Sequence, residues 1–104
     1  MIVIVVIVLL GSGGGGAKWK ASVKDYQVIK PADLGVTVQV TNTGTKPGAP
    51  TCTVEAQDPS YTYTGIDTVT LNIPVQPGHT VTYVDIVTIT RQGAQHVTQV
   101  TVNC

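Results

Sequence analysis

A strict alternation of apolar and polar side chains over residues 34–44 constrains this chain more than any other feature. In Leu-Gly-Val-Thr-Val-Gln-Val-Thr-Asn-Thr-Gly, the side chains of Val36, Val38 and Val40 point one way, and the threonines and glutamine between them point the other. A period of two is typical of a β-strand with one buried face, and the Asn-Thr-Gly at its end favours a turn. We therefore predict a strand that is central to the fold and stops near Asn42.

The composition favours the same class of structure along the rest of the chain. The apolar residues are mostly Val and Ile, Phe is absent, and Thr dominates the polar residues. Because β-branched side chains lose rotamer freedom in a helix and pack well on a pleated sheet, we expect an all-β protein. The 104 residues include six basic and six acidic side chains, and this zero net charge gives no electrostatic case for nucleic-acid binding.

Turn residues divide residues 18–104 into further short segments that alternate in the same way. We expect strands near residues 19–29, 51–57, 68–73, 80–90 and 96–104, with no helix. A face change near Asp25 and Tyr26 indicates a bulge in the first of them. Several short strands separated by turns predict an antiparallel β-sandwich of six to seven strands over residues 18–104.

Two of these segments lead to specific predictions about faces. In residues 68–73, Val69, Leu71 and Ile73 are expected to share the buried face, and Pro74 to end the strand. In residues 80–90 the apolar side chains change parity twice, in the order Val81 and Tyr83, Val84 and Ile86, Val87 and Ile89. Each change predicts a bulge or a strand that passes from one sheet to the other.

Residues 1–10 are an uninterrupted apolar run, and residues 11–17 are rich in glycine. Ten residues are too few to cross a bilayer as a helix, which takes about 20, but they match the apolar core of a secretory signal. No basic residue precedes the run, whereas Lys18 and Lys20 follow it, and positive charge on that side opposes export. We therefore predict that residues 1–10 are the remnant of a longer signal or membrane anchor, followed by a flexible linker at 11–17.

Two other interpretations of residues 1–10 stay open. The run could be foreign to the natural protein, or it could form a β-strand, because Ile and Val are better strand formers than helix formers. A terminal apolar strand on a flexible tether could insert into the sheet of a neighbouring subunit, as in donor-strand filaments. This last alternative predicts self-assembly through residues 1–10.

Cys52 and Cys104 are the most informative pair of residues. Each shares a strand face with valines, Val54 beside the first and Val100 and Val102 beside the second, so both are expected to point into the core. Two inward cysteines on the third and last strands could meet between the sheets, and outside the cytoplasm they would be oxidised. We predict a disulfide, with two buried free thiols in a cytosolic protein as the alternative. No CxxC motif and no nearby His indicates a metal site.

No group of residues indicates catalysis. His79 falls in a predicted Pro-Gly turn and His96 at the start of a strand, so both are expected to lie in solvent. The carboxylates are scattered over outward faces and turns, where solubility explains them: Asp25, Asp33, Glu55, Asp58, Asp67 and Asp85. The glycines at 11–16 lack the Lys-Ser/Thr of a phosphate loop, and no serine lies in a nucleophile elbow. We expect a protein that is not an enzyme and needs no cofactor.

Four aromatic residues, Tyr61, Tyr63, Trp19 and Tyr26, are the candidate binding surface. Tyr at alternate positions in a loop presents flat amphipathic rings of the kind that contact a protein partner or a sugar. The competing interpretation is that these rings cover the rim of a small core.

Short turn motifs resemble those of a known family. Val-Thr-Asn-Thr-Gly-Thr-Lys-Pro at 40–47, a strand that ends in Asp58, and Val-Gln-Pro-Gly-His-Thr-Val-Thr-Tyr at 75–83 resemble FxLYD-type and CARDB-like Ig-fold modules of bacterial envelope proteins and lipoproteins. Where the namesake motif of that family would stand, residues 53–58 read Thr-Val-Glu-Ala-Gln-Asp. The resemblance implies an Ig-like sandwich that is non-catalytic, extracytoplasmic and tethered at its N-terminus.

These features together predict a membrane-tethered or secreted module that acts in binding or as a spacer at the bacterial cell surface. Its expected partner is a protein or an envelope polysaccharide, and its contact with the membrane runs through residues 1–10. The alternative, from a different class, is a structural filament subunit that polymerises by donating residues 1–10 to a neighbour.

Overall fold

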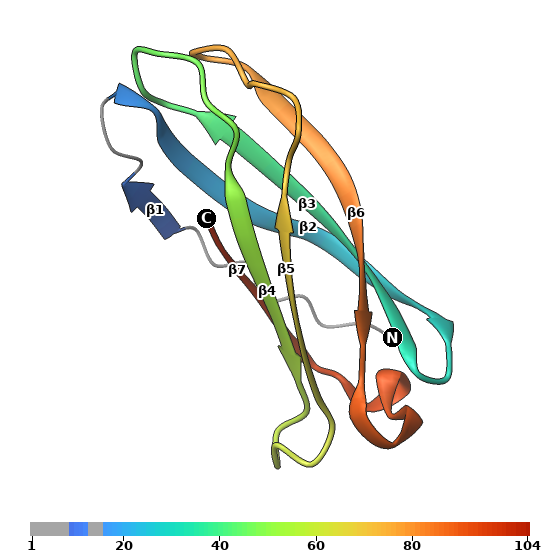
Figure 1. Cartoon of the computed structure of the whole chain (residues 1–104). Helices are drawn as coiled ribbons and strands as arrows, with labels where there is room; N and C mark the ends of the chain where they lie inside the picture. The colour runs from blue at the N-terminus through green and yellow to red at the C-terminus, as the bar shows by residue number, and fades with distance from the viewer. Residues whose placement is uncertain (1–8, 13–15) are drawn as a thin grey trace.

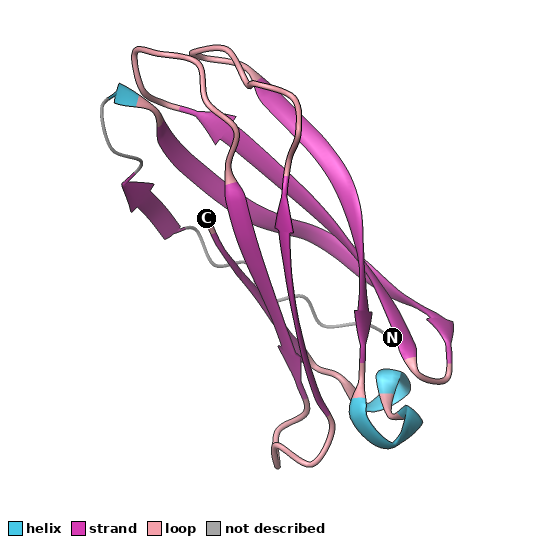
Figure 2. Cartoon of the chain, viewed as in Figure 1, coloured by secondary structure: helices cyan, strands magenta, loops and turns pink. Residues whose placement is uncertain are grey.

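The chain forms two antiparallel sheets that pack face to face, as the computed structural model shows (Figures 1 and 2). The structure describes the backbone of residues 9–12 and 16–104, and the side chains of residues 16–104. One sheet has the strand order β1-β2-β3-β6 and the other has the order β5-β4-β7. The predicted all-β class and two-layer arrangement are confirmed, and the described part of the chain contains no α-helix.

The elements follow one another with short connections. The strands are β1 (Leu9–Ser12), β2 (Lys18–Lys30), β3 (Asp33–Asn42), β4 (Thr51–Gln57), β5 (Thr64–Thr70), β6 (Thr80–Thr88) and β7 (Gln99–Asn103). Two short 3₁₀ turns, η2 (Thr90–Gln92) and η3 (Ala94–His96), connect β6 to β7. The last strand is therefore shorter than predicted, because residues 94–96 form a turn.

β3 has the central position predicted for it, with β2 on one side and β6 on the other. Val36, Val38 and Val40 are fully buried and form the middle of the core. Between Val23 and Asp25 the pairing of β2 with β3 shifts register, next to the predicted bulge. Alternation thus identifies both the strand and its buried face where one side faces the core and the other faces water.

β1 consists of the last two residues of the apolar run and the first two residues of the glycine-rich segment. Leu9–Ser12 pairs antiparallel with residues 18–21 of β2, at the edge of the four-stranded sheet. Gly11 and Ser12, predicted as linker, are therefore part of a strand. Residues 1–8 and 13–15, on which the other predictions about a signal, an anchor or a donated strand fall, lie outside the described residues.

β5 begins and ends earlier than predicted. It runs from Thr64 to Thr70 and pairs with β4 along its whole length, from Gln57 opposite Thr64 to Thr51 opposite Thr70. Ile73, predicted to face the core, is 72% exposed. The alternation continues past Thr70, and the amide of Leu71 still donates to the carbonyl of Pro50 at 3.0 Å. The ladder stops there because Pro50 has no amide to donate.

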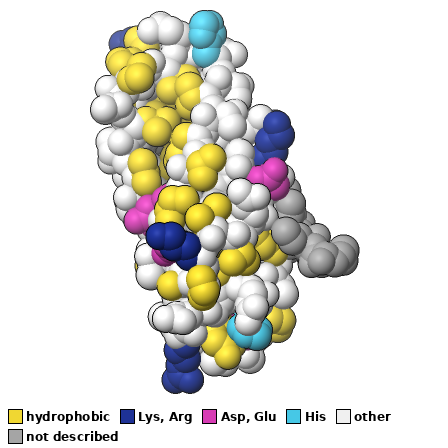
Figure 3. All heavy atoms as spheres, turned by 90° about the vertical axis from the view of Figure 1, so that its right-hand side faces the viewer, with side chains coloured by type: hydrophobic (Ala, Val, Ile, Leu, Met, Phe, Trp, Pro, Cys, Tyr) yellow, Lys and Arg dark blue, Asp and Glu magenta, His cyan; other side chains and the backbone are white. Residues whose placement is uncertain are grey.

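β6 keeps one register against β3 from Thr80 to Thr88, so the two predicted parity changes are wrong. Its odd-numbered residues face the other sheet, and Val84 and Ile86 on the opposite side are 60% and 49% exposed. Asp85 takes an inward position and is 4% exposed. Figure 3 looks onto the side of the molecule that lies at the right in Figure 1 and shows hydrophobic side chains exposed along much of its length. The pattern misled because this edge strand has apolar residues on both faces.

Cys52 and Cys104 form the predicted disulfide, but not between the sheets. β4 and β7 are neighbours in the three-stranded sheet, and Thr53 lies opposite Asn103. The same register, continued by one residue, places Cys52 opposite Cys104. The bond therefore joins adjacent strands of one sheet, because the third predicted strand and the last one pair directly.

Candidate functional site

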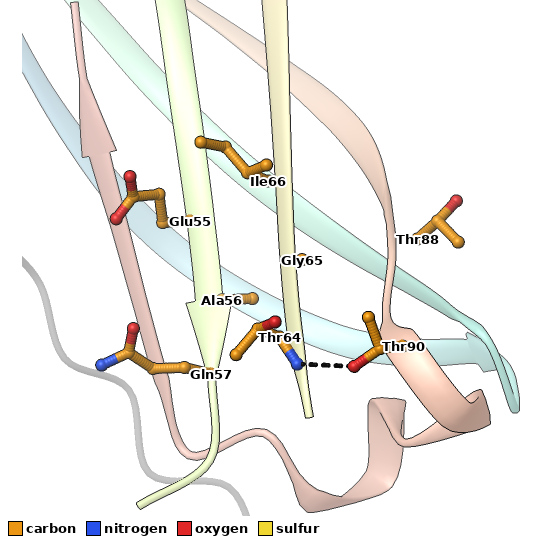
Figure 4. Close-up of a pocket in the computed structure, with 8 residues that line it drawn as sticks. All are labelled: Glu55, Ala56, Gln57, Thr64, Gly65, Ile66, Thr88 and Thr90. Atoms are coloured by element: carbon orange, nitrogen blue, oxygen red, sulfur yellow. Dashed lines mark hydrogen bonds between the residues drawn. The ribbon is translucent and has the colours of Figure 1, made fainter. Parts of the chain in front are cut away.

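Three loops meet at one end of the sandwich, the lower end in Figure 1. They are the β2–β3 turn, the β4–β5 loop and the segment that contains η2 and η3, and we call residues 28–33, 58–64 and 89–98 the loop end. The amide of Ile89 donates to the carbonyl of Ala32 at 2.7 Å, and the amide of Ala94 donates to that of Pro31 at 3.1 Å. The amide of Thr64 donates to Thr90 Oγ1 at 3.1 Å (Figure 4). The three loops are therefore one connected unit.

Asp58 fixes the conformation of the β4–β5 loop and is buried, contrary to the prediction of a surface carboxylate. Its carboxylate accepts hydrogen bonds from Ser60 Oγ at 2.6 Å and from the amide of Tyr63 at 2.9 Å. These bonds, the one from the Ser60 hydroxyl first, lower the pKa of Asp58 to about 2. Hydrogen bonds to the charged carboxylate, and not regular backbone pairing, therefore hold this loop in its conformation.

Tyr63 turns from this loop towards the η2–η3 segment and stacks on His96. The ring centroids are 4.4 Å apart and the planes are inclined by 19°. A side chain at Gly93 would overlap the ring of Tyr63, so the stack requires glycine there. His96 is exposed, as predicted, but the stack holds its ring in place.

A groove of about 490 Å³ lies between the loops of this end. It is lined by Val28, Ile29, Lys30, Pro31, Tyr63, Arg91, Gln92, Gln95 and His96. Lys30 and Arg91 supply two cations, and neither forms an ion pair with any described residue. The lining has no carboxylate. Its chemistry is that of two cations and two amides beside a stacked pair of rings.

Arg91 and Gln92 have left-handed backbone conformations, with φ of 55° and 52°. For residues other than glycine such a conformation costs on the order of 1 kcal/mol each and persists only where neighbouring contacts impose it. The hydrogen bonds of Thr90 and Ala94 on either side supply those contacts. The chain therefore holds the side chains of Arg91 and Gln92 at the groove at a cost in conformational energy.

The four aromatic residues predicted as a binding surface do not lie together. Trp19 and Tyr26 are each only 5% exposed and belong to the core, so the prediction of a surface role is wrong for both. The hydroxyl of Tyr26 donates to the carbonyl of Val97 at 3.2 Å. Tyr63 lines the groove, while Tyr61 is 68% exposed and points away from the core. The core interpretation therefore holds for two of the four residues.

A second cluster of polar side chains, not predicted from the sequence, lies where the edge strands of the two sheets come together. We call the contact of β5 with β6 the edge seam. A side chain at Gly65 of β5 would contact the carbonyl of Thr88 and the side chain of Val87 in β6, so the strands approach closely there. Further along, the carboxyl group of Asp85 is hydrogen-bonded to that of Asp67.

Burial first, and then the Asp67 carboxyl group, raise the pKa of Asp85 to about 7. Tyr83, two residues away on the same face, has its pKa raised to about 12 by burial and by the same two carboxyl groups. A single parity for residues 81–89 would have placed Asp85 inside, among the inward odd-numbered positions. The apolar Val84 and Ile86 indicated a change of parity instead, and that change is wrong.

Two smaller pockets lie along the edge seam. One of about 390 Å³ is lined by residues of β4 and β5 and by Thr88 and Thr90, with Glu55 and Gln57 on the outer face of β4 (Figure 4). The other, of about 260 Å³, lies at the end of the seam and is lined by Leu71, Ile73 and Val81 together with Asn72, Thr82 and Tyr83. Neither brings together groups suited to acid–base chemistry. Among the residues of known placement, no three His, Cys, Asp or Glu side chains are grouped as metal ligands. The described part contains no helix of the length and hydropathy needed to cross a membrane.

The comparisons with known proteins give a family but no activity. A family model described as "Domain of unknown function (DUF4307)" matches residues 1–102, which include the apolar run as well as the sandwich. No curated protein and no solved structure matches the chain. Because the matched segment covers nearly all of the sequence, the chain belongs to the DUF4307 family.

Proposed function

We propose that this protein is a non-catalytic extracytoplasmic module, membrane-tethered or secreted, that binds a partner at the bacterial cell surface. The observation that supports this best is the disulfide between Cys52 and Cys104, which uses the only two cysteines of the chain. Structural disulfides persist in oxidising compartments and are rare in the cytosol. The tether is the apolar run of residues 1–10, which lies within the segment matched by the family model.

We further propose that the sandwich is Ig-like, of the type found in FxLYD and CARDB-like envelope modules. The strand order supports this: β3 lies between β2 and β6, and β4 lies between β5 and β7. In an Ig sandwich, strands A, B and E are neighbours in one sheet, while C and F are neighbours in the other. The disulfide differs, because the Ig bond joins the two sheets and this one joins adjacent strands.

The groove at the loop end is the binding site in this proposal, and its partner is a glycan that bears carboxylate or phosphate groups. Two cations, Lys30 and Arg91, complement an anionic ligand, and the amides of Gln92 and Gln95 suit hydroxyl groups. The stacked rings of Tyr63 and His96 offer a surface for a sugar ring. A spacer, the other role predicted from the sequence, would need none of these features.

Titration of the full-length protein with polygalacturonate, an acidic glycan, tests this site, with neutral dextran as the comparison. We expect binding to polygalacturonate that weakens with salt, and a loss of about two- to fivefold in affinity for both Lys30→Gln and Arg91→Gln. Lys46→Gln, at the opposite end of the sandwich, is the matched control and is expected to bind as well as the unchanged protein. Equal binding of dextran, or an equal loss with Lys46→Gln, would contradict the groove as the site.

The alternative function is a filament subunit that donates its N-terminal apolar strand to a neighbour. One observation favours it: Leu9–Ser12 already pairs as a strand with the edge of β2. If that pairing forms between subunits, the full-length protein assembles into large species that resist denaturant, and deletion of residues 1–10 abolishes them. Sedimentation of both forms distinguishes the two functions. A filament subunit forms polymers at full length that the deletion abolishes, whereas a tethered module forms no ordered polymer at full length and monomers after the deletion.

A further inference from the structure

The buried carboxyl pair at the edge seam has a geometry that neither solubility nor packing explains. Asp85 lies on β6 and Asp67 on β5, so the hydrogen bond between them joins the two sheets. In register, Asp85 is opposite Val36 of β3 and Asp67 is opposite Val54 of β4. Asp67 and Tyr83 are the titratable groups that interact with Asp85. Tyr26 of β2, which is opposite Val36, is a further buried titratable group on the inward face of the same sheet.

A hydrogen bond between two carboxyl groups requires that one of them keeps its proton. Asp85 is almost wholly buried, and its Oδ2 has no hydrogen-bond partner among the described residues. Unless it is protonated, this oxygen places a negative charge in the core beside a second carboxylate. Among the described groups, those that raise the pKa of Asp85 include no cation.

We propose that Asp67 and Asp85 form a proton-dependent latch that holds the two sheets together along the edge seam. With the shared proton present, the pair is a neutral–anionic hydrogen bond across the seam. When the proton is lost, two carboxylates face each other with no described cation interacting with Asp85, and β5 and β6 separate more readily. The protein is therefore most compact in mildly acidic surroundings. This inference does not depend on the proposed function.

The sign of the pH dependence follows from the folded and unfolded pKa values. Asp85 has a pKa of about 7 in the folded chain, against the ordinary aspartate value of 3.8. Between these values the folded state binds more protons than the unfolded state, so stability falls as the pH rises through this window. Below the window the latch is complete, and above pH 7 its contribution is lost. Tyr83, with a pKa of about 12, does not titrate in this range.

Urea denaturation of the full-length protein at pH 5 and pH 8 tests the latch. We expect the unfolding equilibrium constant to rise at least about tenfold between these pH values in the unchanged protein. In Asp85→Asn, which keeps the size of the side chain and can donate to Asp67, this rise is expected to vanish. Asp25→Asn, at an exposed position on β2, is the matched control and should keep the full rise.

Carbon-13 NMR of the aspartate carboxyl carbons provides a second measurement that does not depend on the folding of a variant. The Asp85 carboxyl carbon is expected to titrate well above pH 5, and the methyl signals of Val36 and Val54 to shift with it. Titration of Asp85 near the ordinary aspartate value of 3.8 would overturn the proposal. So would the same rise in the unfolding constant in Asp85→Asn as in the unchanged protein.

Discussion

At the scale of single residues, Asn42 does more than end a strand. Its side chain is fully buried, and its Nδ2 donates to the carbonyls of Lys46 at 2.8 Å and Val75 at 2.9 Å. Its Oδ1 accepts from the amide of Gly44 at 2.8 Å. One amide group thus ties the end of β3 to the β3–β4 connection and to the segment before β6.

Replacing this residue tests that role. We expect Asn42→Ala to lower the free energy of unfolding by about 2–3 kcal/mol, because buried carbonyl and amide groups lose their partners. Asn72→Ala, at an exposed position, should change it by less than about 0.5 kcal/mol. The measurement is urea denaturation at neutral pH, and equal effects of the two substitutions would contradict the assigned role.

The sequence predicts the turn at Asn42 but not all the hydrogen bonds of its side chain. The Asn-Thr-Gly motif indicates a turn at Asn42, because Asn and Gly accept turn conformations. The bond to Val75 cannot be predicted from the motif, since the partner lies 33 residues away. Asp58 shows the same limit: a turn is predictable from Asp-Pro-Ser, but its burial depends on the packing of the surrounding loops.

At the scale of elements, the buried face of a strand can be predicted where one side of the strand is apolar and the other is polar. β3 and β4 face the core on one side and have polar residues on the other, and their buried faces follow from alternation. β5 and β6 are edge strands whose patterns are less regular. In β6 the residue types are opposite to their environments. The apolar Val84 and Ile86 are exposed, and the charged-type residue Asp85 is buried.

The faces of β6 can be tested by a matched pair of substitutions. Val87 is fully buried, and Val87→Thr places a hydroxyl group in the core, with an expected cost of about 1–3 kcal/mol in the free energy of unfolding. Val84→Thr changes an exposed side chain and should cost less than about 0.5 kcal/mol. Thermal or urea denaturation measures both. A larger cost at Val84 than at Val87 would show that the parity of β6 is assigned incorrectly.

At the scale of the whole molecule, the groove could not have been predicted. Its lining comes from three connections that are far apart in sequence and meet only because the strands share one end of the sandwich. The aromatic residues singled out in the sequence contribute Tyr63 alone to the groove. The cations Lys30 and Arg91 showed no motif, because their relation is purely spatial.

The disulfide acts at the same scale, since it closes a loop across 52 residues of sequence. In the loop-entropy model this closure is worth about 4 kcal/mol. That is a large share of the roughly 5–15 kcal/mol that stabilises a typical domain. Replacing both cysteines by Ser, or reducing the bond, should therefore lower the urea midpoint strongly. An unchanged midpoint after verified reduction would contradict this role of the bond.

The proposed extracytoplasmic function requires that the protein meets an oxidising environment in the cell. The most direct measurement is peptide mapping of the native protein, purified from cells whose free thiols were alkylated before lysis. The account predicts a cross-linked peptide that contains Cys52 and Cys104, with no alkylated form of either residue. Recovery of both cysteines in alkylated form would place the protein in a reducing compartment and contradict the proposed extracytoplasmic function.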